Sequence, residues 1–597
     1  MSWSSHAKNQ LRRCLVWLSG SVVLFLRLQT LGQLAYSVGT LEYLALPSFP
    51  FALGVFCLQI FFFLSQAPLC LTHILWLVGR FGFNEPGTEP IRPGFSPSHA
   101  TPVDVIIFTC REPLAVIERT LEATLQIDWP PHLLNVYLAD DGGDPTVQQL
   151  VNRAARDHPE ISRIFYCSRA LRASAKAGNL QFAIGTSAQH GGGSELVLTL
   201  DADTAPDACI LKELVPYFHL SRASTGQKPL GFVQPPQFFV NVPEVDWLAR
   251  SQLYYHVLLQ RFYNQWGYAL WSGTNALFSR SALSPMILQQ LTDSSLSSGS
   301  SIVEDTLATI LIHNAGFSSV YHDLVVARGL APMSLLGLTA QCVRIFTGGF
   351  QNLLLTRCLT NLPSPISLMS WWRSLWLVIF PLSRVVPALS ITWQLIRLLG
   401  PAFLAPAVGL VSASGGPFKL SHPWVSWISF ELYVLLINWE FRVDQWARVR
   451  FDHAMAWIPW IAIPRAFTSV VFRAPSTWSL LRSSLLTSAE YWLLTLGVVT
   501  PIVGSALALY RQDPTSLLIF LPLSISVFSL LIEWWRLTFS RRVDPISLQD
   551  IIPHRNNPSR RHPASQTHTP WYSGFEHLTI ACLGMLLYSC FDACSPT

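Results

Sequence analysis

The chain carries apolar runs of membrane-spanning length on both sides of a long stretch that contains none. The runs cover residues 14–37 and 50–79 first, and then lie near 368–394, 424–440, 489–510, 516–536 and 573–591. A helix needs roughly 20 apolar residues to cross the hydrocarbon core of a bilayer. The pattern therefore predicts two transmembrane helices within residues 1–81 and about five within residues 366–597.

The composition agrees with a membrane protein. Half of the residues are hydrophobic and only 13% are charged, whereas soluble globular proteins carry about 25% charged residues. The net charge is only +5, and no strongly basic domain is present to neutralise phosphates, so a nucleic-acid partner is excluded from the leading interpretations. The 11 cysteines include no CxxC pair, which indicates neither a zinc site nor a disulfide framework.

Basic residues around the apolar runs orient the chain. Arg12 and Arg13 precede the first run and Arg80 follows the second, and cytoplasmic loops of membrane proteins carry an excess of Lys and Arg. The Arg-rich loops near 441–485 and 538–570 are expected in the cytosol for the same reason. We therefore expect a multi-pass protein of the plasma membrane, or of the inner membrane in a bacterium, in contact with membrane lipids.

The stretch between the runs, residues 82–345, has the pattern of an α/β domain facing the cytosol. Apolar strand runs cover 103–108, 134–138 and 195–200, and a helical pattern covers 116–125. Strands that alternate with helices favour a parallel sheet with helices on its faces. The length is sufficient for a core of its own.

Two acidic motifs follow predicted strands. Asp140 and Asp141 end the second strand, and Asp201 and Asp203 end the third. In α/β sheets nucleotides bind at this end of the strands, although Asp-Asp-Gly also suits an ordinary turn. Two carboxylates leaving one apolar strand are costly unless a cation lies between them. Such oxygen ligands suit Mg²⁺ or Mn²⁺ that carries substrate phosphates.

Two further motifs lie near the end of this stretch. Glu304 and Asp305 precede a predicted helix, where acids also favour the positive end of the helix dipole, so capping is an alternative to catalysis. Gln341 and Arg344 begin an amphipathic stretch. We expect an interfacial helix over 346–365 that leads back to the membrane.

Seven motifs occur in a fixed order between the flanking apolar runs: Asp140-Asp141-Gly142, Lys176-Ala177-Gly178-Asn179, Asp201-Ala202-Asp203, Phe232-Val233-Gln234-Pro235-Pro236-Gln237, Gly273-Thr274-Asn275-Ala276, Val303-Glu304-Asp305 and Gln341-Cys342-Val343-Arg344. By these motifs the segment from about 100 to 350 resembles the processive family 2 glycosyltransferases, and in particular cellulose synthase catalytic subunits. The resemblance implies a GT-A (Rossmann-like) cytosolic domain inserted between transmembrane helices.

The resemblance also implies roles for single residues. Asp140 and Asp141 would lie at the uracil and ribose, Lys176 and Asp201 near the diphosphate, and Asp203, with Asp201, at a Mg²⁺ or Mn²⁺ ion. Asp305, next to Glu304, would be the general base that deprotonates the acceptor hydroxyl for an inverting attack. Gln341 and Arg344 would hold the acceptor and the diphosphate. Further substrate-binding residues are implied at Thr109, Glu112, Gln234, Gly273 and Thr274.

The implied reaction is transfer from a UDP-sugar, with UDP-glucose the first choice, to a growing β-linked polysaccharide such as cellulose that passes through the membrane. Alternatives are chitin, a hyaluronan-like polymer, a mixed-linkage glucan, transfer of one sugar to a lipid and, remotely, a transporter with an inactive insert. Ile345 replaces a family Trp, and the family's gating loop has a poor counterpart near 478–483. Acceptor, linkage, processivity, accessory subunits and homo-oligomer formation therefore stay open.

Overall fold

The computed structural model describes residues 93–354, with gaps at 171, 192, 224–227, 243–251, 253–254, 257–259, 266, 293–303 and 333–334, and scattered positions within 18–28 and 502–509. Among these residues no helix combines the length and the apolar character that crossing a membrane requires. Apart from the scattered positions, the apolar runs interpreted as spans lie outside the described residues and stay predictions.

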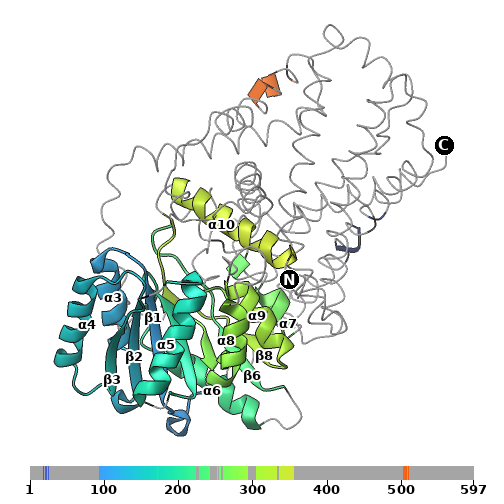
Figure 1. The fold of residues 1–597 in the computed structure, drawn as a ribbon. Coiled ribbons are helices and arrows are strands. Elements are labelled where there is room, and N and C mark those ends of the chain that lie inside the picture. Colours follow the sequence, from blue (N-terminus) through green and yellow to red (C-terminus); the bar gives the residue numbers. More distant parts are fainter. Residues whose placement is uncertain are drawn as a thin grey trace, which may run out of the picture.

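A seven-stranded sheet forms the centre of the described region (Figure 1). Its strand order is β3-β2-β1-β4-β7-β6-β8, and a two-stranded sheet pairs β5 with β9. The strands are β1 (Val103–Thr109), β2 (Leu134–Asp140), β3 (Arg163–Cys167), β4 (Leu196–Asp201), β5 (Ala205–Pro206), β6 (Leu230–Gln234), β7 (Leu277–Ser279), β8 (Ser318–Tyr321) and β9 (Ala327–Arg328). The strands expected at 103–108, 134–138 and 195–200 are β1, β2 and β4.

The first four strands of the sheet run parallel. β1 pairs with β2 and β4, and β2 pairs with β3, all in the same direction. β7 runs antiparallel to both of its neighbours, β4 and β6. A mostly parallel sheet of this kind, covered by helices, is the GT-A-like α/β fold that the motif order implied.

Helices lie on both faces of the sheet (Figure 1). They are α3 (Leu114–Leu125), α4 (Pro145–Asp157), α5 (Ala175–Gly191), α6 (Ile210–Ala223), α7 (Gln260–Gln265), α8 (Pro285–Thr292), α9 (Glu304–Asn314) and α10 (Leu335–Leu354). Short 3-10 turns occupy Pro97–His99, Pro131–Leu133 and Arg280–Leu283. The helix expected at 116–125 is α3.

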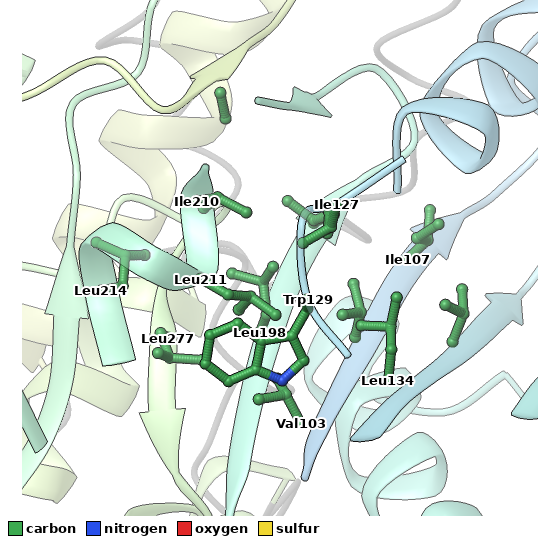
Figure 2. Packing of buried hydrophobic residues seen from close by; sticks show 14 of the residues in the cluster. Val103, Ile107, Ile127, Trp129, Leu134, Leu198, Ile210, Leu211, Leu214 and Leu277 are labelled. Carbon is green, nitrogen blue, oxygen red and sulfur yellow. The ribbon is translucent and has the colours of Figure 1, made fainter. Parts of the chain in front are cut away.

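Two separate apolar cores flank the sheet, because successive strand residues point to opposite faces. On β1, Val103, Val105 and Ile107 join a core with α3, α4 and α6, while Ile106 and Phe108 join a core with α5, α8 and α9. Figure 2 shows the first core, where the Trp129 indole lies among the strand and helix side chains of this cluster. Burial on both faces explains why the strands read as continuous apolar runs.

The helix α10 carries the Gln-x-x-Arg motif. It begins at Leu335 and continues to Leu354 without a break. The boundary expected between residues 345 and 346 therefore falls inside one helix. Its continuation to residue 365 lies outside the described residues.

Candidate active site

Strand register brings the acidic motifs to one edge of the sheet. In the β1–β2 pair Thr109 lies opposite Asp140, and in the β1–β4 pair Phe108 lies opposite Asp201. Because these strands are parallel, their carboxyl ends meet at the same edge. Residues separated by about sixty positions in the chain thus share one site.

Asp140 holds the turn that follows β2. Its carboxylate accepts hydrogen bonds from the Gly142 and Asp144 backbone N–H groups, the latter at 2.8 Å, and from the Tyr166 hydroxyl at 2.9 Å. Burial, together with the hydrogen bond to Asp140 and its charge, raises the pKa of Tyr166 to about 12. The turn that Asp-Asp-Gly suits is therefore present, and it fixes the carboxylate beside the predicted nucleotide site.

Asp141 forms a two-point ion pair with Arg169. The guanidinium Nε and Nη2 each lie 2.7 Å from one carboxylate oxygen of Asp141. Arg169 also donates to the carbonyl oxygens of Ala173 and Ala175, so it orders the loop before α5. Sequence reasoning missed Arg169, because it lies outside every motif and spacing gives no sign of a pair formed across the sheet edge.

Lys176 connects two of the acidic motifs. Its ammonium forms an ion pair with Asp201, donates to the Gly273 carbonyl at 2.8 Å and lies 3.9 Å from a Glu304 oxygen. It also lies 5.3 Å from the centre of the Phe108 ring. Burial lowers the pKa of Lys176, but the surrounding carboxylates outweigh that effect and raise it. The lysine is therefore a fixed cation in the middle of the site.

The rest of the Lys-Ala-Gly-Asn motif places Lys176. The Asn179 amide donates to the Ala139 carbonyl at 2.9 Å, which ties α5 to the end of β2. A Cβ atom at Gly178 would lie 2.2 Å from the Ala173 carbonyl oxygen, so only glycine permits this close approach. Spacing alone did not reveal these two positioning roles.

Asp203 lies among other negative groups. Loss of hydration, with the charges of Asp201 and Glu112, raises the pKa of Asp203 to about 7. The Glu112 carboxylate accepts from the Thr109 hydroxyl at 2.7 Å and from the Cys110 N–H. The Thr204 hydroxyl lies 3.3 Å from one Asp203 oxygen. Negative charge and loss of hydration therefore prevail at Asp203, although the charge of Lys176 acts in the opposite direction.

These carboxylates fit a divalent cation that brings ligands of its own. Within the described ranges, no group of three or more His, Cys, Asp or Glu side chains is placed to bind a metal. Mg²⁺ and Mn²⁺ commonly take one or two protein carboxylates and fill the remaining positions with water and substrate phosphate. Asp203 and Asp201 provide that smaller set, and the raised pKa of Asp203 is the effect that a bound cation would relieve.

Gln234 joins two motifs that are far apart in sequence. Its amide nitrogen donates to the Thr274 carbonyl at 3.2 Å and to the Asn275 side-chain oxygen at 2.9 Å, while its oxygen accepts from Ser272 N–H at 2.9 Å. The Thr274 hydroxyl in turn accepts from the Asp201 N–H at 2.8 Å. Gln234 and Thr274 therefore hold the Gly273–Asn275 segment beside Asp201.

Asp305 and Glu304 face this segment from the start of α9. A Cβ atom at Gly273 would lie 3.6 Å from the Asp305 Oδ2 atom, and Gly273 has a φ of +89°, which favours glycine. The other Asp305 oxygen accepts from the Thr306 N–H. Burial raises the pKa of Glu304. The positive charges of Lys176 and Arg344 act in the opposite direction but do not cancel the rise.

The helix α10 completes one side of the site. Arg344 is near enough for its charge to act on Glu304, and the Gln341 side-chain oxygen accepts from Gln252 at 3.3 Å. Ile345 is half-buried, and the neighbouring Phe346 is buried in the protein interior. The contacts of Lys176 thus bring Asp201, Gly273 and Glu304 together, and Asp140 ends β2 at the same edge of the sheet.

Residues 101–348 match the protein family described as Glycosyltransferase like family 2. This segment is therefore similar to family 2 glycosyltransferase domains. Cellulose synthase catalytic subunits described as UDP-forming are similar to it: one from Xanthomonas axonopodis pv. citri is 26% identical over 273 residues, and one from Komagataeibacter sucrofermentans is 28% identical over 252 residues. These matches cover 46% and 42% of this chain but 34% and 31% of the relatives, so the chain spans about a third of their length.

Comparison with solved structures gives only partial likenesses, with TM-scores below 0.5 in the two examples that follow. The mannosyltransferase PcManGT from Pyrobaculum calidifontis, in complex with GDP-Man and Mn²⁺, is 16% identical, with a TM-score of 0.41, over 69% of this chain and 99% of that one. S. aureus TarS 1–349 in complex with UDP-GlcNAc is 14% identical, with a TM-score of 0.26, over 60% and 90%.

Proposed function

We propose that the glycosyltransferase domain uses a UDP-sugar, with UDP-glucose the first choice, to elongate a β-linked polysaccharide such as cellulose. The observation that carries the proposal is the continuous contact from Asp201 through Lys176 to Glu304, with Asp305 across from Gly273. This chain of contacts joins the predicted diphosphate position to the predicted base. The similarity to UDP-forming cellulose synthase subunits supports the choice of donor.

In the proposed reaction Asp305 acts as the general base. Its carboxylate takes the proton of the acceptor hydroxyl as that oxygen forms a bond to the anomeric carbon. The bond between the anomeric carbon and the diphosphate oxygen breaks, and UDP leaves with the electron pair, so the configuration inverts. Lys176 and Arg344 supply positive charge on the leaving side, and fixed charges of this kind need no reorganisation during the reaction.

Asp203, with Asp201, is the proposed holder of Mg²⁺ or Mn²⁺. When bound, the ion would offset the charge of the departing diphosphate. Asp201 already forms an ion pair with Lys176. We therefore propose Asp203 as the main protein ligand of the ion. Asp140 and Asp141 would contact the nucleoside through a turn that Arg169 and Tyr166 hold in place.

The acceptor and the route of the product are the finer parts of the proposal. We expect the product to leave through the transmembrane helices predicted on both sides of the domain, in the plasma membrane or a bacterial inner membrane. Chitin, a hyaluronan-like polymer, a mixed-linkage glucan or single-sugar transfer to a lipid are competing products. Ile345 favours these alternatives over cellulose, since its side chain offers no flat face on which a sugar ring can stack.

Donor use and product can be measured together. Purified full-length protein is incubated with single radiolabelled UDP-sugars, with GDP-mannose as a contrasting nucleotide, and both UDP release and polymer are quantified. We expect release from UDP-glucose, a product digested by a β-glucanase, and none of either with Asp305→Asn. Turnover of GDP-mannose alone, or hydrolysis of a UDP-sugar without transfer, would contradict the proposal.

A further inference from the structure

Arg119 is a buried cation for which the described residues provide no hydrogen-bond acceptor. It lies on α3, its side chain is 2% exposed, and its three guanidinium nitrogens are buried without a hydrogen bond in the part of the chain that the structure describes. A buried charge is costly unless it is paired and hydrogen-bonded. The position therefore needs a physical reason.

Three other arginines with mostly buried side chains each contact an aspartate. Arg169 binds Asp141 through two nitrogens, Arg261 binds Asp323 through its Nε and Nη2 atoms, and Arg280 binds Asp104. The fold thus pairs such arginines by ordinary means. Arg119 departs from this pattern, since no carboxylate among the described residues forms an ion pair with it.

The place of Arg119 connects it to the Asp201–Asp203 turn. The next residue, Thr120, donates its hydroxyl hydrogen to the Ala202 carbonyl at 2.6 Å, and this hydrogen bond is buried. Loss of hydration lowers the pKa of Arg119, and the negative charge of Asp203 opposes that shift. The helix α3 therefore holds a positive charge against the turn that carries the proposed metal ligands.

We propose that Arg119 is a positioning residue that limits how tightly the Asp201–Asp203 turn binds a divalent cation. Its guanidinium makes no hydrogen bond within the described residues, and its helix contacts the turn that carries the proposed ion ligands through Thr120 and Ala202. A fixed positive charge beside that turn repels the cation. Such a limit would let a metal–UDP product leave after each transfer. The inference rests on the proposed metal-dependent function.

The test measures Mn²⁺ alone, without nucleotide or sugar. Free Mn²⁺ is titrated by electron paramagnetic resonance against the full-length protein, and melting temperatures are recorded for the same samples. Arg119→Met removes the charge but keeps most of the apolar stem, and Arg119→Lys keeps the charge. Arg153→Met is the matched control, because it removes an arginine that is exposed and pairs with Glu118 beside Arg119.

We expect Arg119→Met to bind Mn²⁺ at least about threefold more tightly, with an equal or higher melting temperature because an unpaired buried charge is gone. Arg119→Lys and Arg153→Met should bind Mn²⁺ as the wild type does. If the wild type binds Mn²⁺ and Arg119→Met binds it equally well or more weakly, this inference alone is overturned. Absence of Mn²⁺ binding by the wild type would overturn the proposed metal site, and this inference with it.

Discussion

An aspartate lies at each end of the strands of the central sheet, one buried and one partly buried. The two aspartates differ in the groups that surround their carboxylates. At the amino ends of the strands, Asp104 is fully buried and accepts from Asn135 at 2.9 Å, from the N–H and hydroxyl of Ser194, and from Arg280. At the carboxyl ends, Asp203 has negative neighbours, and its pKa is raised to about 7. One carboxylate is satisfied by the fold, and the other is not.

The difference separates structural from functional charge in one domain. A satisfied buried ion pair fixes the packing of distant segments, since Asp104 and Arg280 are 176 residues apart in sequence. A dehydrated carboxylate whose negative neighbours outweigh the nearby positive charges has a stability cost that a bound cation can remove. We therefore interpret the Asp104–Arg280 pair at the amino ends of the strands as structural. We interpret the carboxyl ends of the strands as a binding site that its substrate completes.

The largest effect is expected from Asp203→Asn. The substitution removes a proposed ligand charge, so UDP release should fall by orders of magnitude, as it should when EDTA is added to the wild type. The melting temperature should not fall, because the substitution relieves repulsion with Asp201 and Glu112. Both are measured on one preparation. Full turnover of this variant in excess chelator would exclude the metal role.

The next effect concerns Asp305→Asn, and Asp144→Asn provides its control. Asp144 is a helix cap, which accepts from the Thr146 N–H at 2.8 Å, so its substitution should lower stability slightly and leave turnover unchanged. If Asp305 is the base, its substitution should lower turnover by about a hundredfold or more while UDP affinity persists. Equal, small effects of the two substitutions on turnover and stability would instead favour capping alone.

Asp104→Asn should reverse the outcome seen at Asp203. Loss of the charge leaves Arg280 buried without its anion, and breaking a buried pair costs about 3 to 5 kcal/mol of unfolding free energy. Turnover per folded molecule should stay close to that of the wild type. Chemical unfolding and active-site titration of the variant measure the two quantities. A large loss of turnover in well-folded protein would remove the distinction between the two ends.

The smallest expected effect is at Ile345, on α10. An indole stacks on the apolar face of a sugar ring better than isoleucine does, and buried Phe346 does not provide that surface. Ile345→Trp should therefore lengthen the polymer or slow its release if the pocket admits the added volume. Chromatography of labelled product gives the length distribution. If neither Ile345→Trp nor Ile345→Ala changes it, this position does not contact the acceptor.

The sequence predicted the functional end of the sheet better than the structural end. Acids directly after apolar strands, as at Asp140 and Asp201, can be placed by strand patterning alone, and the structure confirms those strands. The pairing of Asp104 with Arg280, and of Asp141 with Arg169, depends on tertiary contacts across the fold that no local spacing encodes. The antiparallel β7 was unforeseen as well, because its three residues are too few to show a strand pattern.

The roles of individual motif residues divide in the same way. Lys176 was expected near the diphosphate, and its contacts with Asp201, Gly273 and Glu304 make it the centre of the site. The motif order could not show that Gly178 and Asn179 position this lysine, since both act through backbone atoms of other segments. The nucleoside, metal and acceptor roles stay predictions.

The most direct test of the account is the effect of a cation on thermal stability. Melting temperatures of full-length wild type, Asp104→Asn and Asp203→Asn are measured with UDP, before and after Mn²⁺ is added. A ligand that binds the native state raises its stability according to its affinity and concentration. We predict that Mn²⁺ raises the melting temperature of wild type and Asp104→Asn but not of Asp203→Asn. An equal rise in all three proteins would contradict it.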